Sequence, residues 1–239
     1  MRKTKIFLAG ITSLFLLGAT LPAFAQVGEQ RNDFAIGFNA GINMNTVSFS
    51  PTVKQNSLNG MTGGFTARYI SEKYFSIICG VQLEVNYSQK GWDEKFTDSS
   101  NNTITTRGYR HKMNYIEIPF LSHLGFGKEH GTQFYVLAGP QIGFLINDAE
   151  EKTGEWTDVT LSETESAVYG KAIENKFSYG ITGGLGMELK TKKLGNFLIE
   201  GRYYYELSDF FKTTKSDYFS RAANMTLCAK ITYLFNLSK

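Results

Sequence analysis

The chain has 239 residues, of which 42% are hydrophobic and 20% charged, and its formal net charge at neutral pH is +3. Three of the basic residues stand within the first five positions, which leaves 22 Lys and Arg against 22 Asp and Glu in the rest of the chain. This balance gives no reason to expect nucleic-acid binding. Two cysteines, Cys79 and Cys228, fall on opposite faces of predicted strands, which argues against a disulfide-bonded scaffold.

The N-terminus has the layout of a secretory signal peptide. Arg2, Lys3 and Lys5 precede an apolar run at 6–21, and Ala23-Phe24-Ala25 supplies the small-x-small pattern of a cleavage site. The apolar run is shorter than the roughly 20 residues that a membrane-spanning helix needs. We therefore expect residues 1–25 to be removed after export and residues 26–239 to form one all-β domain.

Beyond the signal, strict alternation of apolar and polar residues predicts strands. Residues 80–88 read GVQLEVNYS, in which Val81, Leu83, Val85 and Tyr87 alternate with polar side chains. This is the period of a strand with one apolar face. The same pattern predicts eight strands, at 34–45, 61–70, 75–88, 114–122, 132–146, 176–189, 196–208 and 222–236.

The connections between these strands alternate in length. Long polar segments at 46–60, 89–113, 147–175 and 209–221 interleave with shorter ones at 71–74, 123–131 and 190–195. In an up-and-down meander, all the long segments lie at one end. The pattern predicts an eight-stranded antiparallel up-and-down transmembrane β-barrel, with short periplasmic turns, long external loops and both termini in the periplasm.

The polar faces of the predicted strands resemble a barrel interior more than a water-exposed surface. They consist mainly of Gly, Ser, Thr and Asn, with a few charges of both signs. The interior of an eight-stranded barrel is just wide enough for side chains to fill it. We therefore predict a lumenal salt-bridge network of Arg68, Glu84, Glu188, Glu200, Arg202, Glu206 and Lys230.

Aromatic residues gather near the ends of the predicted strands, for example Tyr87, Tyr205 and Phe235. Rings with a polar edge favour the boundary between lipid and water, so these residues suit the aromatic girdles of a spanning barrel. The alternative is a soluble lipocalin-like barrel, in which the apolar face surrounds a ligand. The sequence contains no lipocalin Gly-x-Trp motif, and both tryptophans, Trp92 and Trp156, lie in predicted loops.

Four segments in chain order carry a resemblance to a known family. They are LEVNYSQKG at 83–91, YIEIPFL at 115–121, FYVLAGPQIGFLI at 134–146 and RYYYELSDF at 202–210. Together they resemble the PorT-like outer-membrane β-barrels, often described as porin family proteins. The resemblance implies an eight-stranded barrel in the outer membrane of a Gram-negative cell. It also implies an association with a protein-secretion or surface-assembly complex.

The residue types that carry chemistry are sparse. A lipid-modifying barrel enzyme needs a histidine beside a hydroxyl nucleophile at the external rim. His123 and His130 fall in a predicted periplasmic turn, and His111 lies near the external rim with no serine close in sequence. We interpret His111 as a solvated loop residue and expect no catalytic residue, no metal site and no cofactor.

The predicted external loops are where specificity is expected. Segment 147–175 has a net charge of −6 and segment 89–113 a net charge of +2. We interpret the acidic segment as a solvated, mobile loop; the alternatives are that the two segments fold together or that the acidic one holds divalent cations that bridge to lipopolysaccharide. Trp92 and Trp156 are the expected contacts for a partner.

The sequence thus favours a non-enzymatic outer-membrane barrel with a filled, charged lumen, whose partners are outer-membrane lipid, lipopolysaccharide and other envelope proteins. A secretion component, a lipid-modifying enzyme and a soluble ligand-binding barrel remain alternatives.

Overall fold

The computed structural model describes residues 29–96, 106–127, 131–156, 161–191, 195–215 and 217–237. The expected signal peptide lies outside these residues. The strands are β1 (Glu29–Ser50), β2 (Gln55–Asn56), β3 (Leu58–Tyr74), β4 (Ile77–Glu94), β5 (Arg107–Gly127), β6 (Thr132–Gly154), β7 (Phe177–Thr191), β8 (Gly195–Glu206) and β9 (Arg221–Asn236), with the short helix α2 (Glu163–Val168) between β6 and β7. Within the described ranges, no helix is long and apolar enough to cross a membrane.

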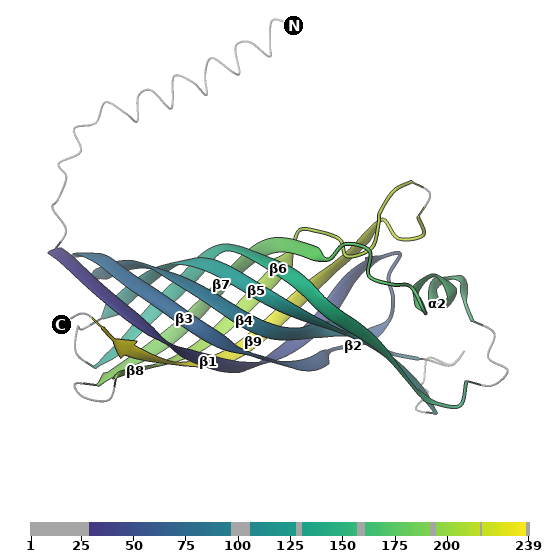
Figure 1. Cartoon of the computed structure of the whole chain (residues 1–239), viewed down its shortest axis with the longest axis horizontal. Coiled ribbons are helices and arrows are strands. Elements are labelled where there is room, and N and C mark those ends of the chain that lie inside the picture. Colours follow the sequence, from purple (N-terminus) through teal and green to yellow (C-terminus); the bar gives the residue numbers. More distant parts are fainter. Residues whose placement is uncertain are drawn as a thin grey trace, which may run out of the picture.

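Eight of the strands form a closed antiparallel ring (Figure 1). Each long strand pairs with the next one along the chain, and β1 pairs with β9 from Ala35↔Asn236 to Ser50↔Arg221 to close the barrel. The two-residue strand β2 is additional and pairs only with the end of β4. The all-β, eight-stranded, up-and-down prediction is therefore confirmed.

The strand alternation places apolar side chains outside and polar ones inside. On β7, Phe177, Ile181 and Leu185 are 47%, 54% and 67% exposed, whereas Ser178 and Thr182 are each 2% exposed. This is the reverse of the arrangement that the lipocalin-like alternative requires. An apolar outer band and a polar interior are the features of a barrel that is surrounded by lipid.

The connections differ at the two ends of the barrel. The β3–β4 turn contains only Phe75 and Ser76, because Tyr74 pairs directly with Ile77. At the opposite end, the β6–β7 connection includes α2, whose capping box joins Ser162 and Glu165. Since short turns face the periplasm in such barrels, the end that carries α2 is the external one.

The strands run farther at the external end than the sequence pattern predicted. β1 continues to Ser50, β4 to Glu94 and β6 to Gly154, and β5 begins at Arg107, so much of the predicted loops 46–60, 89–113 and 147–175 is strand. The predicted turn at 123–131 is also too long, because β5 continues to Gly127. Beyond the lipid the outer face of a strand no longer needs apolar residues, so the alternation that identifies strands in the membrane is lost there.

Candidate functional site

The centre of the lumen is occupied by a buried ion cluster. Arg202 donates from Nη1 to Glu84 Oε2 at 3.0 Å and from Nη2 to Glu84 Oε1 at 2.6 Å, and it also pairs with Glu200. Lys230 Nζ lies 2.8 Å from Glu84 Oε2. All four side chains are at most 5% exposed. Four of the seven residues predicted for the lumenal network therefore lie in one cluster.

The other three predicted residues lie apart from this cluster. Arg68 and Glu188 form a separate bidentate salt bridge, with N–O distances of 2.8 and 2.7 Å. Glu206 is buried but accepts hydrogen bonds from the backbone N–H and the side chain of Asn224. The lumen thus contains distinct polar layers rather than one continuous network.

A further lumenal ion pair, Lys90–Glu117, was not predicted from the sequence. Lys90 was placed in a loop, whereas the structure places it on β4 with its side chain 1% exposed. Its Nζ also lies 3.8 Å from the centroid of the Tyr204 ring. Between this pair and the Arg202 cluster there is a cavity of about 30 Å³, which is large enough to hold water.

Apolar side chains fill part of the lumen on the periplasmic side of the ion cluster. The buried group there is Ala35, Leu121, Tyr135, Leu137, Leu198 and Leu234. The Tyr135 hydroxyl donates to Glu200 Oε1 at 2.8 Å and so joins this group to the ions. The expectation of a lumen lined mainly by small polar and charged residues did not include these leucines.

The external end is closed by a larger group, here called the aromatic cluster. It consists of Val47, Phe49, Val53, Trp92, Phe96, Tyr109, Met113, Tyr115, Val168, Ile173, Phe210, Phe211, Phe219 and Ala222. Trp92 is its centre: the ring stacks on His111 at 4.6 Å and on Phe210 at 5.8 Å, and meets Phe49 edge-on at 5.2 Å. These residues come from several strands and from the β8–β9 connection, so the cluster ties the external ends of the strands together.

The placement of Trp92 as an exposed loop contact is wrong. Trp92 lies on β4 and is 0% exposed, because its side chain points inward above the lumen. Trp156 is only partly buried, and its ring packs edge-on against Phe96 and Tyr169 at 5.8 and 5.6 Å. Of the two tryptophans, only Trp156 reaches the surface.

His111 is also buried, which corrects its interpretation as a solvated loop histidine. It lies on β5 with 0% exposure, its Nε2 is 3.0 Å from Asp148 Oδ2, and its Nδ1 is 3.6 Å from Glu150 Oε1. Burial lowers the pKa of His111, although the two carboxylates oppose this shift. His123 likewise lies on β5 and is buried, stacked on Tyr135, and not in a turn. His130 lies outside the described residues.

The segment that follows α2 is docked on the inner face of the external strands. Tyr169 packs on Tyr109 with ring centroids 4.1 Å apart and donates its hydroxyl to Glu94 Oε2 at 2.8 Å. The backbone N–H of Gly170 donates to the Glu150 carboxylate at 2.9 Å. Burial raises the pKa of Glu94 to about 7; the hydrogen bond from Tyr169 opposes this shift, and nearby Glu165 adds to it.

The outer face of β4, β5 and β6 carries a row of charges, here called the charge ladder. Asp93, Arg110 and Glu151 are directly opposite one another on adjacent strands. Arg110 Nη2 lies 2.6 Å from Asp93 Oδ2 and Nη1 lies 3.9 Å from Glu151 Oε2, while Lys112 Nζ contacts Glu151 Oε1 at 2.6 Å. The basic and acidic segments noted in the sequence therefore fold against each other.

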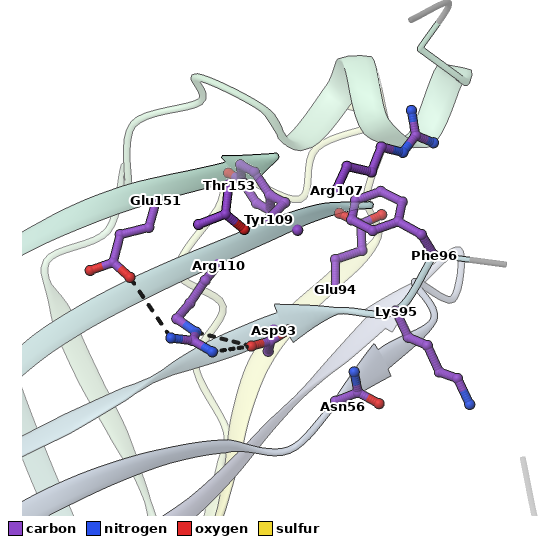
Figure 2. Close-up of a pocket in the computed structure, with 11 residues that line it drawn as sticks. Asn56, Asp93, Glu94, Lys95, Phe96, Arg107, Tyr109, Arg110, Glu151 and Thr153 are labelled. Carbon is purple, nitrogen blue, oxygen red and sulfur yellow. Dashed lines mark hydrogen bonds and ion pairs between the residues drawn. The ribbon is translucent and has the colours of Figure 1, made fainter. Parts of the chain in front are cut away.

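A pocket of about 310 Å³ opens at the tip of these strands (Figure 2). The charge ladder forms one side of it, with Glu94, Phe96, Arg107 and Thr153 on the other sides. Its lining combines both signs of charge with aromatic rings, which suits a polar partner. Among the described residues, no group of three or more His, Cys, Asp or Glu is arranged to hold a metal ion.

Comparison with protein families identifies the class of barrel. Residues 24–212 match the family described as outer membrane protein beta-barrel domain. The chain belongs to this family. Its membership agrees with the apolar outer band and polar lumen, and it places the protein in the outer membrane. None of the curated proteins searched matches the chain.

Several solved structures are similar to this chain at low sequence identity. OprG from Pseudomonas aeruginosa is 13% identical, with 87% of this chain and 98% of OprG covered and a TM-score of 0.41. Neisserial surface protein A is 14% identical, with coverages of 84% and 97% and a TM-score of 0.39. The attachment invasion locus protein Ail of Yersinia pestis is 13% identical, with coverages of 87% and 99% and a TM-score of 0.35.

Proposed function

We propose that this outer-membrane barrel is a non-enzymatic protein that conducts no solute and acts by binding a partner at the cell surface through the external parts of β4, β5 and β6. The observation that carries the proposal is the occupied interior. Apolar side chains, buried ion pairs and the aromatic cluster follow one another along the lumen. A barrel whose interior is filled presents its external end as the surface on which a function can be built.

The buried ions support a closed lumen because they are engaged with one another. Glu84 contacts both Arg202 and Lys230. Both terminal nitrogens of Arg68 donate to the two carboxylate oxygens of Glu188. A passing solute would have to separate these charges without replacing their partners. Breaking a buried pair by removing one partner costs about 3–5 kcal/mol, so opening the lumen is expensive.

The environment of His111 supports a non-enzymatic role. Its ring nitrogens face Asp148 and Glu150, and its face is covered by Trp92. A general base must reach both a nucleophile and the substrate. Packed against Trp92 and held by two carboxylates, His111 is a structural residue of the aromatic cluster. The His111→Gln variant should therefore leave the lipid composition of the outer membrane unchanged, and an altered acyl pattern would favour the lipid-modifying alternative.

The closed lumen is tested by electrical recording in planar lipid bilayers. The purified, folded barrel should give no stable conductance steps, while a wide porin reconstituted in the same bilayers gives them. The variant Trp92→Ala, which empties the centre of the aromatic cluster but leaves the ion pairs, should also remain silent. Regular steps from the wild-type barrel would overturn the proposal.

We propose in addition that, within its family, the chain stands with the PorT-like barrels and takes part in a secretion or surface-assembly complex, with lipopolysaccharide as its lipid neighbour. The four segments quoted from the sequence support this assignment. Affinity purification from outer membranes should recover the barrel together with defined envelope proteins. A barrel recovered alone under conditions that preserve known envelope complexes would remove this part of the proposal.

A further inference from the structure

The external part of β6 is an open strand edge. β7 begins at Phe177 and its last pair with β6 is Phe144↔Phe177, followed by one bond from Leu145 N–H to Lys176 O at 2.8 Å. β6 nevertheless continues to Gly154, paired with β5 on its other side. Across the described residues, no backbone hydrogen bond reaches the free side of residues 146–154. In Figure 1 this part of β6 extends past β7 toward the tip of the external end.

The backbone groups at this edge can be assigned from the pairing. Glu155 N–H bonds Thr106 O at 3.4 Å, so by strand alternation the odd-numbered residues at the end of β6 face β5. The bond of Leu145 to Lys176 and the irregular register between Asn114 and Tyr115 give the same assignment. The N–H and C=O groups of Asp148, Glu150, Lys152 and Gly154 therefore point away from the barrel.

The opposite side of the same sheet shows how such an edge is covered. There, β2 pairs with the end of β4 through Gln55↔Glu94 and Asn56↔Asp93. The segment after α2 does not do the same for β6, because its contacts to Glu150 and Lys152 involve their side chains. Residues 147–149 and 151–155 are exposed. An exposed strand with unpaired backbone groups is a template for an added strand.

The charge ladder indicates which strand fits. It runs Asp93, Arg110, Glu151 and so alternates acid, base, acid up to the open edge. A basic residue opposite Glu151 continues the alternation, at a position where the two side chains approach closely because their backbone groups face away from each other. A second copy of the same edge is a poorer fit, because an antiparallel pairing centred on Glu151 places the two Glu151 side chains opposite each other, and like charges opposite each other are destabilising.

From these observations we infer that the free edge of β6 binds an extended, basic segment of a partner polypeptide by strand addition, with a Lys or Arg opposite Glu151. The inference rests on the proposed surface-binding function and names the chemistry of the partner. Main-chain hydrogen bonds to Asp148, Glu150, Lys152 and Gly154 supply affinity, and the charge ladder supplies selectivity.

The test uses the full barrel in lipid nanodiscs and a synthetic peptide of alternating threonine and lysine, with a threonine–glutamate peptide as its matched control. The lysine peptide should slow hydrogen exchange of the Asp148, Glu150 and Lys152 amides by about tenfold or more, since each gains a hydrogen bond. The Ala149 and Glu151 amides already face β5 and should change little. Equal binding of both peptides, or no protection of the even-numbered amides, would overturn the inference.

Two variants separate the backbone from the side chains. Lys152→Pro removes an N–H from the open edge without breaking the hydrogen bonds to β5. It should weaken the binding of the lysine peptide by about tenfold. Lys152→Ala loses the same side chain but keeps the N–H, so its affinity for the lysine peptide should stay within about threefold of that of the wild type. Equal losses in both variants would exclude strand addition.

Glu151→Lys keeps the whole backbone and should transfer the preference to the glutamate peptide. Unchanged preference in this variant would exclude the charge ladder as the source of selectivity. Heat-modifiable gel mobility verifies that each variant is folded. A barrel that is closed in bilayer recordings but binds no peptide would refute only the inference that β6 binds a strand. A barrel that conducts would refute the proposed function, whatever the result with the peptides.

Discussion

The interior of the barrel changes its chemistry between the membrane and the external end, while the strands keep the same inward and outward sides. On β4, Glu84 points inward and Val85 outward within the membrane, whereas beyond it Trp92 points inward and Asp93 outward. Inside the lipid, buried ion pairs share the centre with one small apolar group, and apolar side chains face the hydrocarbon. Outside it, apolar side chains fill the centre and charged ones face water. The surrounding solvent thus determines whether the outer face of a strand is apolar or charged.

The largest expected effect comes from unbalancing the ion cluster. Arg202→Leu leaves Glu84 and Glu200 in the lumen with only Lys230, and should lower the free energy of unfolding by about 3–5 kcal/mol. The measurement is the denaturant midpoint of the barrel in lipid vesicles. Arg110→Leu is the matched control, because it removes an arginine from an ion pair on the exposed face. Equal midpoints for the two variants would mean that the lumenal ions contribute no more than surface ions.

Truncation at the centre of the aromatic cluster should rank next. Trp92→Ala removes a fully buried ring and should cost about 3 kcal/mol through lost contacts and the cavity left behind. The loss should be concentrated at the external end, where hydrogen exchange of the Phe210 and Ser220 amides should become faster. Trp156→Ala removes a partly exposed ring of the same kind and should cost less than about 1 kcal/mol. If the two tryptophan variants are equally stable, the cluster is not a packed core.

The docking of the segment after α2 should depend on pH through Glu94. Burial raises the pKa of this carboxyl from the ordinary 4.5 to about 7, so the docked state binds a proton that the undocked state has lost. Docking should therefore weaken as pH rises from 4.5 to about 7, and the loss should be complete above that range. Hydrogen exchange at Tyr169 and Gly170 measures it, and Glu94→Gln should abolish this dependence.

His111 should give the external end the opposite pH dependence of stability, which the same experiment can measure. Its lowered pKa means that the neutral ring is favoured in the buried site, so the native external end should lose stability as pH falls below the ordinary pKa of 6.5. With Glu94→Gln in place, only this acidic loss should remain. An unchanged profile in the Glu94→Gln variant would assign the pH dependence to other groups.

The smallest effect is expected at the charge ladder itself. Arg110→Leu breaks the contacts to Asp93 and Glu151, but the Arg110 side chain is 44% exposed and solvent screens the pair. The stability change should stay below about 1 kcal/mol and should shrink further at high salt. A loss as large as that of Arg202→Leu would show that the external sheet depends on its charges for folding.

The parts of the structure that the sequence predicted are those in contact with lipid. Residues such as Ile181 and Leu185 alternate with Gly and Thr because one face meets hydrocarbon, so strand number, barrel topology and the inward direction of Glu84 and Arg202 follow from the pattern. Where that constraint ends, the pattern ends. Trp92 and His111 looked like loop residues because their strands carry charged outer faces at that level.

The pairing of charges was less accessible to sequence reasoning than their burial. Glu206 and Arg202 lie on the same face of β8, yet Arg202 contacts Glu84, 118 positions away in the chain, while Glu206 binds Asn224. Partners across a barrel are set by the register of all the strands, and no local signal specifies them. The open edge of β6 is of the same kind, because it depends on where β7 begins relative to β6.

The aromatic cluster also bears on how the barrel reaches its final position. Its members come from β1, β4, β5 and β9, from the segments just after β1 and β4, and from the β6–β7 and β8–β9 connections, so it cannot form until all of these segments have crossed the bilayer from the periplasm. Packing of the cluster is then a late event in assembly, completed in water on the far side. Withdrawal of β1, β4, β5 or β9 would have to separate these packed side chains first. The cluster therefore opposes withdrawal of the inserted strands and so retains the barrel in the membrane.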